Sequence, residues 1–465
     1  MIPTKATILP NLAARSDLAG PLSTIAQIQF YSEAKDFNRP PPLLASVYEL
    51  LTGSAFAMEG GTGFQFLTAD EAPAPGLLTV WMRIDTRYGD LASGTGRRIE
   101  LFRRLDAMGP DILDRLAAGQ GLLILDWSHE GRPTFWRSNI RRIVEAYAIP
   151  PQNVVVLTQN TAPPDPPVDD APDVRIANAH DFIPQFWRLF FGKSVRRGEK
   201  VIPLGFALSA ETQRKYRYTC MNFEATATRA LIVSKLLDRQ EKGLVSFRKD
   251  QFRRSMPGSQ AFKDELTSVS QPSDQRQNHD RVGRFLAINR NYAIDLPPGT
   301  HPRYAAFFMP VDELKATDIQ IVTEQEMGFP DQQRFTEKTL KAVMSGTPYV
   351  VFGNQGTIRV LRNAGLDVLD DIVDHSYDKF GDPSARMDAA WREVERLISE
   401  PEPVSVTHRE RLMVALDHNR AIFEGPLFHR WIVDPVASLV NLHPAATPDL
   451  KAAAAAVTTC GHAHV

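Results

Sequence analysis

The chain has little cysteine, with only Cys220 and Cys460 among its 465 residues. So few thiols argue against a domain built on disulfides and favour a reducing compartment. Acidic and basic side chains nearly balance, at a net charge of −2. Overall charge therefore predicts no nucleic-acid partner and no binding to an anionic membrane.

Long apolar runs are missing as well. None approaches the roughly 20 residues that span a bilayer. The amino terminus has no basic stretch followed by an apolar run, so no signal peptide is predicted. We therefore expect a cytoplasmic protein, with at most peripheral contact at the inner face of the membrane.

Two common ligand signatures are also absent. We find no Gly-x-Gly-x-x-Gly after a first strand and no Asp-x-Asp in a plausible strand-end setting. The terminal run Cys460–His464 has a metal-like composition, but no matching second half is obvious. The sequence therefore predicts neither a metal nor a resident cofactor.

What the chain does have is an ordinary globular composition, with 43% apolar and 23% charged residues. Short apolar runs alternate with amphipathic helical patterns, which is typical of parallel sheets covered on both faces. The expected strands are 121–126, 153–158, 174–177, 216–221, 304–309, 318–323 and 349–352, and the main expected helices are 109–118, 135–147, 226–239, 357–364, 385–398 and 407–422. The fold class is therefore α/β, with two Rossmann-like domains.

The expected domain boundaries follow from this pattern. Residues 1–200 form a first α/β domain whose first 95 residues are hard to interpret, and residues 201–400 form the second α/β domain. The polar stretch 251–280 is predicted to be a flexible insertion. Helices in 401–440 are expected to pack back on the first domain, before a tail at 441–465.

Candidate ligand residues gather at strand ends of the second domain. Asn222, Glu324 and Gly353 each follow a predicted strand. Ligands of open parallel sheets collect beyond the carboxyl ends of the strands. We therefore expect these positions to converge, in a cleft between the two domains.

Two cations occupy unusual places nearby. Arg229 and Lys338 lie in the first turns of predicted helices, where the helix dipole disfavours positive charge. A phosphate bound between the helix amides and the cation would explain both. The alternatives are an ordinary salt bridge for Arg229 and an exposed lysine on a surface helix.

The second half resembles the donor domain of GT-B glycosyltransferases of bacterial and phage type. The resemblance is clear over residues 319–398 and looser over 216–240. It is carried by Thr323-Glu324, then Thr336-Glu337-Lys338, then Gly346-Thr347-Pro348 with Gly353 and Gly356, and finally Asp374-His375-Ser376-Tyr377-Asp378. The same Glu-Lys helix recurs in fucosyltransferase-like enzymes. The first half shows no such match.

The resemblance implies a nucleotide-sugar donor in the second domain and makes residues 1–200 the acceptor side. Glu337 would accept hydrogen bonds from ribose or sugar hydroxyls, and Lys338 would contact the diphosphate, with Thr336 beside them. Glu324 would lie near the donor sugar or ribose. Gly353 and Gly356 would let backbone amides approach the nucleotide, unless they serve the turns alone.

One loop departs from the family pattern. Asn222 and Arg229 fit the expected strand end and helix start, but the loop between them is acidic, and Thr228 stands where histidine is usual. That departure puts a phosphate role for this loop in doubt.

An inverting transferase also needs a base. Asp126, His129 and Glu130 follow a predicted strand of the first half, and His180 is a second choice. Asp126 could instead cap a turn and His129 could simply be exposed. A retaining enzyme would need no such base, and the sequence leaves the stereochemistry open.

The expected function is therefore the transfer of a sugar from a nucleotide donor to a glycan, glycolipid or protein acceptor, as in polysaccharide biosynthesis. Lys338 and Arg229 would stabilise the departing phosphate without a metal. A non-catalytic nucleotide- or carbohydrate-binding module is the alternative. A sugar-nucleotide epimerase is a weaker rival, because its glycine fingerprint is missing.

Overall fold

The structure is a computed structural model that divides the chain into two compact units, and each unit is described here by itself. Unit 1 comprises Met1–Val201 and Phe423–Val465, and unit 2 comprises Ile202–Ile422. The residues that the structure describes are 28–31, 65–67, 77–83, 102, 105–128, 136–161, 174–180, 205–208, 214–222, 224–239, 241–252, 256–288, 309–324, 327–328, 332–424, 426–428 and 430–431.

Unit 1 contains a six-stranded sheet in the order β2-β1-β3-β4-β5-β6, and every described strand pair is parallel. The strands are β1 (Ile28–Tyr31), β2 (Gln65–Leu67), β3 (Leu77–Arg83), β4 (Gly121–Trp127), β5 (Val154–Thr158) and β6 (Arg175–Asn178). Runs such as Leu122–Leu125 are apolar on both faces, as expected for a strand covered on two sides.

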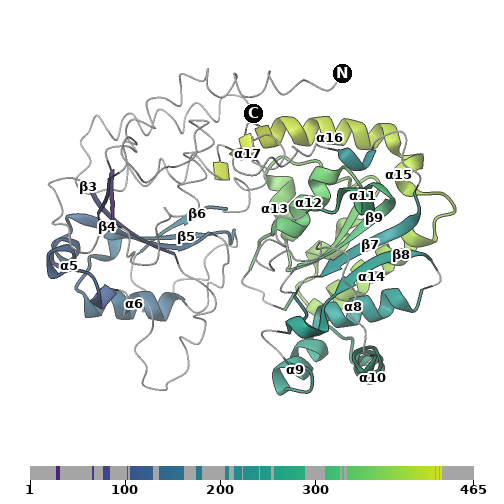
Figure 1. Ribbon diagram of the computed structural model, residues 1–465, viewed down its shortest axis with the longest axis horizontal. Coiled ribbons are helices and arrows are strands. Elements are labelled where there is room, and N and C mark those ends of the chain that lie inside the picture. Colours follow the sequence, from purple (N-terminus) through teal and green to yellow (C-terminus); the bar gives the residue numbers. More distant parts are fainter. Residues whose placement is uncertain are drawn as a thin grey trace. The chain divides into compact units, whose positions relative to one another are not determined.

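One face of this sheet packs on two helices, α5 (Pro110–Ala117) and α6 (Trp136–Ala146) (Figure 1). The side chains of every second residue enter that core. Its members include Leu123, Leu125, Val154, Val156, Ile112, Leu116, Ile140 and Ile143. The alternate residues, among them Asp126 and Leu157, therefore belong to the opposite face.

Unit 2 contains a four-stranded parallel sheet in the order β10-β9-β7-β8. The strands are β7 (Tyr216–Asn222), β8 (Gly243–Phe247), β9 (Thr317–Thr323) and β10 (Tyr349–Phe352). The chain runs from β7 outward to β8, and then crosses to the other side of β7 to form β9. The boundary between β7 and β9 is therefore the topological switch point of this sheet.

Helices cover both faces of the second sheet (Figure 1). They include α8 (Ala227–Leu237), α12 (Glu337–Ser345), α13 (Thr357–Asn363), α14 (Pro383–Ser399) and α16 (Arg409–Glu424). Helix α12 ends at Gly346, whose φ of 80° is a left-handed conformation that glycine adopts without strain. Shorter helical segments are η4 (Pro151–Asn153), η5 (Phe206–Leu208), η6 (Lys249–Gln251), α11 (Val311–Lys315), η8 (His375–Lys379), α15 (Val404–Thr407) and α17 (Pro426–Phe428).

The region predicted to be a flexible insertion, 251–280, contains regular helices. This region holds α9 (Gln260–Ser268) and the start of α10 (Gln275–Ala287), and both helices pack against α8. The Ser259 hydroxyl caps α9 by accepting a hydrogen bond from the Phe262 amide. The few buried side chains of the two helices, including Phe262, Leu266, Val282 and Phe285, recur at helical spacing within a polar sequence. The polar composition concealed this sparse apolar stripe.

Strand β8 was also missed by the sequence analysis. Only its second half, Val245–Phe247, is well buried, so its apolar run is very short. The strand expected at 304–309 lies outside the described residues except for Met309. The other expected strands and helices listed above lie within two residues of observed elements.

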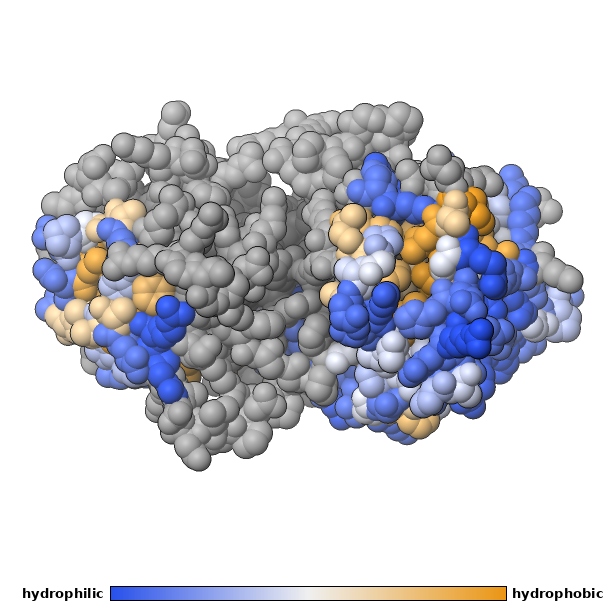
Figure 2. Space-filling view, turned by 90° about the horizontal axis from the view of Figure 1, so that it is seen from below, coloured by the Kyte–Doolittle hydropathy of each residue, from blue (hydrophilic) through white to orange (hydrophobic). Residues whose placement is uncertain are grey.

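Toward its carboxyl end the chain returns to unit 1, at Phe423. There the Trp431 indole packs edge-on against the His180 imidazole, with ring centroids 5.4 Å apart. Among the described residues, no helix has both the length and the apolar character needed to cross a membrane. The face of unit 2 shown in Figure 2 is largely hydrophilic, with apolar side chains confined to smaller areas.

Candidate functional site

The candidate site begins where β7 and β9 end, at the switch point of the second sheet. The Thr323 hydroxyl donates a hydrogen bond to the Asn222 side-chain oxygen, and the Asn222 amide donates to Cys220 Sγ at 3.2 Å. Asn222 is fully buried, and burial raises the pKa of the Cys220 thiol to about 12. The thiol is therefore protonated, so this edge of the sheet presents hydroxyl and amide groups rather than a reactive nucleophile.

Arg229 is brought to the same point by the first turn of α8. The helix begins at Thr226, whose hydroxyl accepts a hydrogen bond from the Arg229 amide. The guanidinium is buried and donates to the carbonyls of Glu224 at 2.9 Å and Thr323 at 3.1 Å. Its Nε–H has no partner among the described residues. Arg229 thus ties the start of α8 to the end of β9 and keeps one donor unused.

Glu324 follows β9 and caps α12. Its carboxylate accepts hydrogen bonds from the Thr336 amide at 2.9 Å and from the Thr336 hydroxyl at 2.6 Å, and also from the Thr339 hydroxyl. The start of α12, where we expected a phosphate, is thus met by a carboxylate of the chain itself. The carboxylate is stabilised there, because a helix amino terminus carries partial positive charge.

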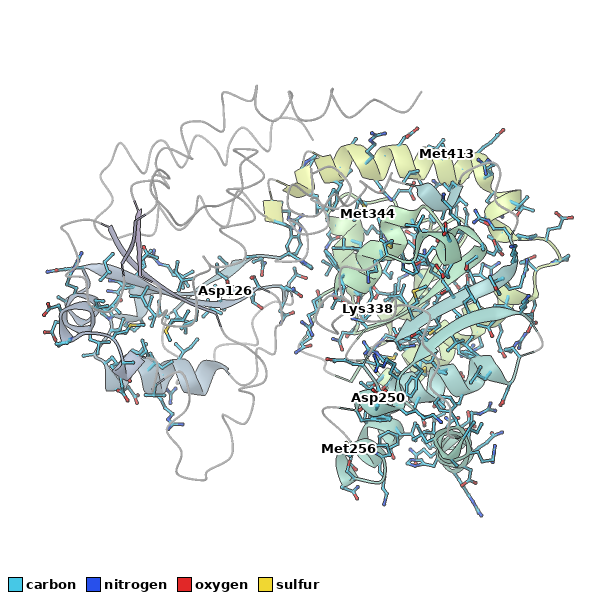
Figure 3. The ribbon with its side chains drawn as sticks, viewed as in Figure 1. Asp126, Asp250, Met256, Lys338, Met344 and Met413 are labelled. Atoms are coloured by element: carbon cyan, nitrogen blue, oxygen red, sulfur yellow. The ribbon has the colours of Figure 1, made fainter. Side chains whose placement is uncertain are left out.

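Glu337 and Lys338 form an ion pair at the start of α12, with Lys338 Nζ 2.6 Å from Glu337 Oε1. Lys338 is marked in Figure 3. Burial alone would raise the pKa of the Glu337 carboxyl, but the positive charges of Lys338 and Lys341 and the hydrogen bond from Lys338 lower it to about 2. Glu337 is therefore a carboxylate at neutral pH and can accept hydrogen bonds from hydroxyls.

Each candidate glycine has a local structural role. A Cβ at Gly353 would lie 2.9 Å from the Thr357 hydroxyl and 3.4 Å from Glu324 Cγ, so side chains of the same unit already approach this backbone. Gly356 has a φ of 81° and begins α13. Close packing accounts for glycine at position 353, and the left-handed backbone accounts for it at position 356.

The Asp-x-Ser-Tyr-Asp motif also has local roles. Asp374 caps η8 through the Ser376 amide, and the Tyr377 hydroxyl accepts a hydrogen bond from the Val351 amide of β10. Asp378 caps α13 by accepting from the amides of Ile358 at 3.1 Å and Arg359 at 2.9 Å. The motif therefore holds η8 against β10 and the start of α13.

Carboxylates meet the amino termini of three helices that begin beyond the carboxyl ends of this sheet. Glu324 caps α12 and Asp378 caps α13, and Glu265 of α9 accepts a hydrogen bond from the Thr228 amide of α8 at 3.0 Å. Each carboxylate satisfies amides that would otherwise lack partners. An anionic ligand at any of these three termini would have to displace or share these contacts.

Sequence reasoning missed two buried groups near this edge. Arg386 of α14 donates to the carbonyls of Gly353, Phe380, Gly381 and Met327, and burial lowers its pKa to about 10. Gln332 precedes α12 and accepts a hydrogen bond from the Asn354 amide at 3.4 Å, whereas its own amide nitrogen has no partner among the described residues. Neither stands in a recognisable motif, so nothing in the sequence singled them out.

Of the three residues of unit 1 predicted to supply a base, the structure describes only Asp126. Asp126 lies at the carboxyl end of β4 (Figure 3), is 1% exposed, and accepts a hydrogen bond from the Ser128 amide at 2.8 Å. It therefore caps a turn, which was the alternative stated for it. His129 and Glu130 lie outside the described residues. His180, the second choice, is fully buried against Trp431.

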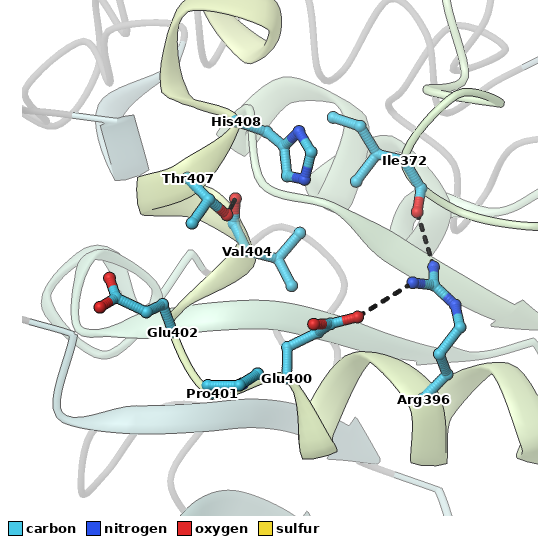
Figure 4. Close-up of a pocket in the computed structure, with 8 residues that line it drawn as sticks. All are labelled: Ile372, Arg396, Glu400, Pro401, Glu402, Val404, Thr407 and His408. Atoms are coloured by element: carbon cyan, nitrogen blue, oxygen red, sulfur yellow. Dashed lines mark hydrogen bonds and ion pairs between the residues drawn. The ribbon is translucent and has the colours of Figure 1, made fainter.

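A pocket of about 240 Å³ lies elsewhere in unit 2 (Figure 4). Its lining includes Arg396, Glu400, Val404 and His408. Val404 donates its amide to Asp318 near the start of β9, so this pocket adjoins the amino ends of the strands rather than the carboxyl ends. In the part of the chain that the structure describes, no group of three or more histidine, cysteine, aspartate or glutamate side chains is arranged to hold a metal ion.

The candidate donor residues therefore share one edge of one sheet. Asn222 and Arg229 both bond to Thr323 there. Glu324 bonds to Thr336 and lies beside Gly353, and Glu337 and Lys338 follow at the start of α12. No family model matches the chain, and neither a curated protein nor a solved structure shows significant similarity to it.

Proposed function

We propose that the chain is a metal-independent glycosyltransferase of the GT-B type, whose unit 2 holds a nucleotide-sugar donor. The observation that carries the proposal is the set of polar groups at the β7–β9 switch point, where Arg229 and Asn222 meet Thr323. Open parallel sheets bind nucleotides at this point of the fold. The resemblance of residues 319–398 to donor domains supplies the reaction class.

Each group has a role in this proposal. The Glu337 carboxylate accepts hydrogen bonds from donor hydroxyls, and the Lys338 ammonium beside it contacts the diphosphate. As the glycosidic bond breaks, charge builds on the leaving diphosphate, and Lys338 stabilises it. Arg229 contributes positive potential and an unused Nε donor at the switch point. The acceptor is a glycan, a glycolipid or a protein.

The non-catalytic binding module stays a second candidate because of one specific observation. Lys338 is already paired with Glu337, and three helix amino termini are already met by carboxylates of the chain. Cations and amides that are satisfied in this way have less to offer a developing charge. A module that binds hydroxyl groups through Glu337 without catalysis needs no such free charge.

A thermal-shift panel of nucleoside diphosphates and nucleotide sugars tests donor binding, with and without EDTA. A donor that binds only the folded chain raises its melting temperature, and the shift grows with the logarithm of the ligand concentration above Kd. We expect at least one nucleoside diphosphate to do so, with EDTA making no difference. Lys338→Met should abolish the shift, whereas Lys263→Met, the same change at an exposed lysine of α9, should leave it intact.

Release of nucleoside diphosphate from the stabilising nucleotide sugar then separates the two candidates. Turnover that Lys338→Met and Glu337→Gln both remove supports a transferase. Binding without turnover across a panel of glycan acceptors supports the module. If no compound of the donor panel shifts the melting temperature, the donor site itself is wrong.

A further inference from the structure

The amino terminus of α8 is met by a carboxylate from a different helix. Glu265 of α9 accepts a hydrogen bond from the Thr228 amide at 3.0 Å. Thr228 is the second residue of α8, so its amide has no acceptor within the helix. A helix amino terminus also carries partial positive charge. Glu265 therefore stands at a place where an anionic ligand is stabilised.

Arg229 gives an independent indication of a ligand at this terminus. It follows Thr228 and is 1% exposed, and its Nε–H has no hydrogen-bond partner among the described residues. The guanidinium reaches back beyond the start of the helix, because it donates to the Glu224 carbonyl at 2.9 Å. A buried donor that lacks an acceptor destabilises the fold. An anion at the start of α8 would supply that acceptor.

Exposure distinguishes this terminus from the two others that meet carboxylates. Glu324 at α12 is 5% exposed and Asp378 at α13 is 6% exposed, so both are enclosed by the protein. Glu265 is only half-buried, and its neighbour Asp264 is exposed. Solvent therefore reaches Glu265, and an anion can approach the start of α8 from the same side.

The Glu265 carboxylate can leave this place while α9 stays where it is. Phe262 and Leu266 hold the helix in the core, at 5% and 1% exposed. A glutamate side chain has several rotatable bonds, so rotation alone turns its carboxylate outward. Opening the α8 terminus therefore requires a change of rotamer, and no unfolding of the helix.

We propose that the start of α8 is an anion site at which the Glu265 carboxylate competes with the ligand. The site is closed while Glu265 accepts from Thr228 and open when the carboxylate turns away. The apparent affinity for the anion is therefore reduced by the fraction of molecules in which the site is open.

The inference rests on the proposed function for the identity of the anion, which is the diphosphate of the donor. The Thr323 carbonyl receives the Arg229 guanidinium, and the next residue, Glu324, caps α12. The starts of α8 and α12 therefore flank the end of β9. A diphosphate has two phosphate groups, one for Arg229 at α8 and one for Lys338 at α12. Glu265 would then regulate how tightly the donor is held.

Inorganic pyrophosphate tests this competition, by isothermal titration calorimetry on the full chain. Glu265→Gln removes the negative charge and keeps a carbonyl acceptor for the Thr228 amide. We expect this variant to bind pyrophosphate about tenfold more tightly than the wild type, because a like charge no longer opposes the ligand. Asp264→Asn is the matched control, since it makes the same change of charge at the neighbouring exposed residue. It should bind pyrophosphate as the wild type does.

Hydrogen exchange then locates the bound anion. In Glu265→Gln, pyrophosphate should slow exchange in a peptide that contains residues 226–229, whereas chloride at equal ionic strength should not. Arg229→Lys in the same background keeps the positive charge and removes the Nε donor, so it should lose most of the gain in affinity. If this double variant does not fold, the exchange measurement alone decides the location.

Three results overturn the inference. One is equal binding of pyrophosphate, or none, by the wild type and Glu265→Gln. Another is an equal gain in Asp264→Asn, which assigns the effect to overall charge. The third is protection from exchange at a different part of the chain.

These results are separate from the outcome for the donor. If pyrophosphate distinguishes the variants but no nucleotide sugar stabilises either protein, the anion site is supported and the donor proposal fails. If nucleotide sugars stabilise the wild type and pyrophosphate binds it and Glu265→Gln equally, the donor site is supported and competition by Glu265 is wrong.

Discussion

The Thr323 hydroxyl of β9 donates its hydrogen bond to the side-chain oxygen of Asn222 on β7, and this bond joins the ends of the two strands that flank the switch point. Both residues are buried, and the Thr323 carbonyl also receives the Arg229 guanidinium. Thr323 therefore links two groups of the candidate donor site. Its side chain can be altered without removing either of them.

Thr323→Val tests this link, because valine keeps the shape and removes the hydroxyl. The Asn222 oxygen then loses the Thr323 donor while remaining buried. We expect a loss of about 1–3 kcal/mol in the free energy of unfolding, measured by urea denaturation. Thr407→Val is the control, because its partly exposed hydroxyl bonds only to carbonyls near it in the chain, and it should cost little. Equal losses in the two variants would contradict the role of the Asn222 bond.

The Glu324 carboxylate at the start of α12 makes a second prediction. Glu324→Ala removes an anion from the helix amino terminus, and the loss of such a cap costs about 1–2 kcal/mol. The vacated terminus then favours another anion. Inorganic phosphate should therefore raise the melting temperature of Glu324→Ala more than that of the wild type. Chloride at equal ionic strength is the control, and an equal response of both proteins to phosphate would count against the idea.

The Glu337–Lys338 pair predicts a specific acid sensitivity. The pKa of Glu337 is about 2 in the folded chain against an ordinary 4.5, so its stabilising contribution is complete above pH 4.5 and is lost as the pH falls toward 2. A shift of this size corresponds to about 3 kcal/mol. Lys338→Met raises the pKa of Glu337, although Lys341 still acts on it. We expect a loss of about 1 kcal/mol at pH 7 and a smaller further loss between pH 4.5 and 2.

Other carboxylates titrate in the same range, so the contribution of Glu337 must be measured as the difference in unfolding free energy between the wild type and a variant. Asp367 and Asp370, for example, also have lowered pKa values. Urea denaturation of the wild type and of Lys338→Met at a series of pH values isolates the contribution of the Glu337–Lys338 pair to the free energy of unfolding. In the Glu337→Gln background, Lys338→Met should no longer change the acid dependence. A persistent change there would assign the effect to another carboxylate.

The sequence predicted the parallel sheets because their strands are continuous apolar runs. Strand β10 (Tyr349–Phe352) and helix α14 were found within two residues of their ends. It also predicted which candidates reach one edge, since the carboxyl ends of parallel strands must meet there. The placement of Asn222, Glu324 and Gly353 at this edge could be predicted without knowledge of side-chain contacts.

The hydrogen-bond and ion-pair partners of the charged side chains could not be predicted from the sequence in this way. A cation in a first helical turn suggested a phosphate, but Arg229 binds two backbone carbonyls, and Lys338 pairs with the residue beside it. The carbonyls to which Arg386 donates belong to residues 5 to 59 positions away in the chain. No periodicity or motif records contacts of that kind, because they depend on tertiary packing.

The ordered helices in the polar stretch 256–288 make the last prediction. Phe262 of α9 is 5% exposed and packs on Phe252, with ring centroids 5.8 Å apart. Phe262→Ala should therefore cost about 3–5 kcal/mol in the free energy of unfolding, and should expose α9 to limited proteolysis at Lys263. Met256→Ala, a few residues earlier at a side chain that is 61% exposed, should change stability by less than about 0.5 kcal/mol. If trypsin cleaves the wild type at Lys263 as readily as Phe262→Ala, then α9 is not a stable part of unit 2, and the expectation of a flexible insertion was right after all.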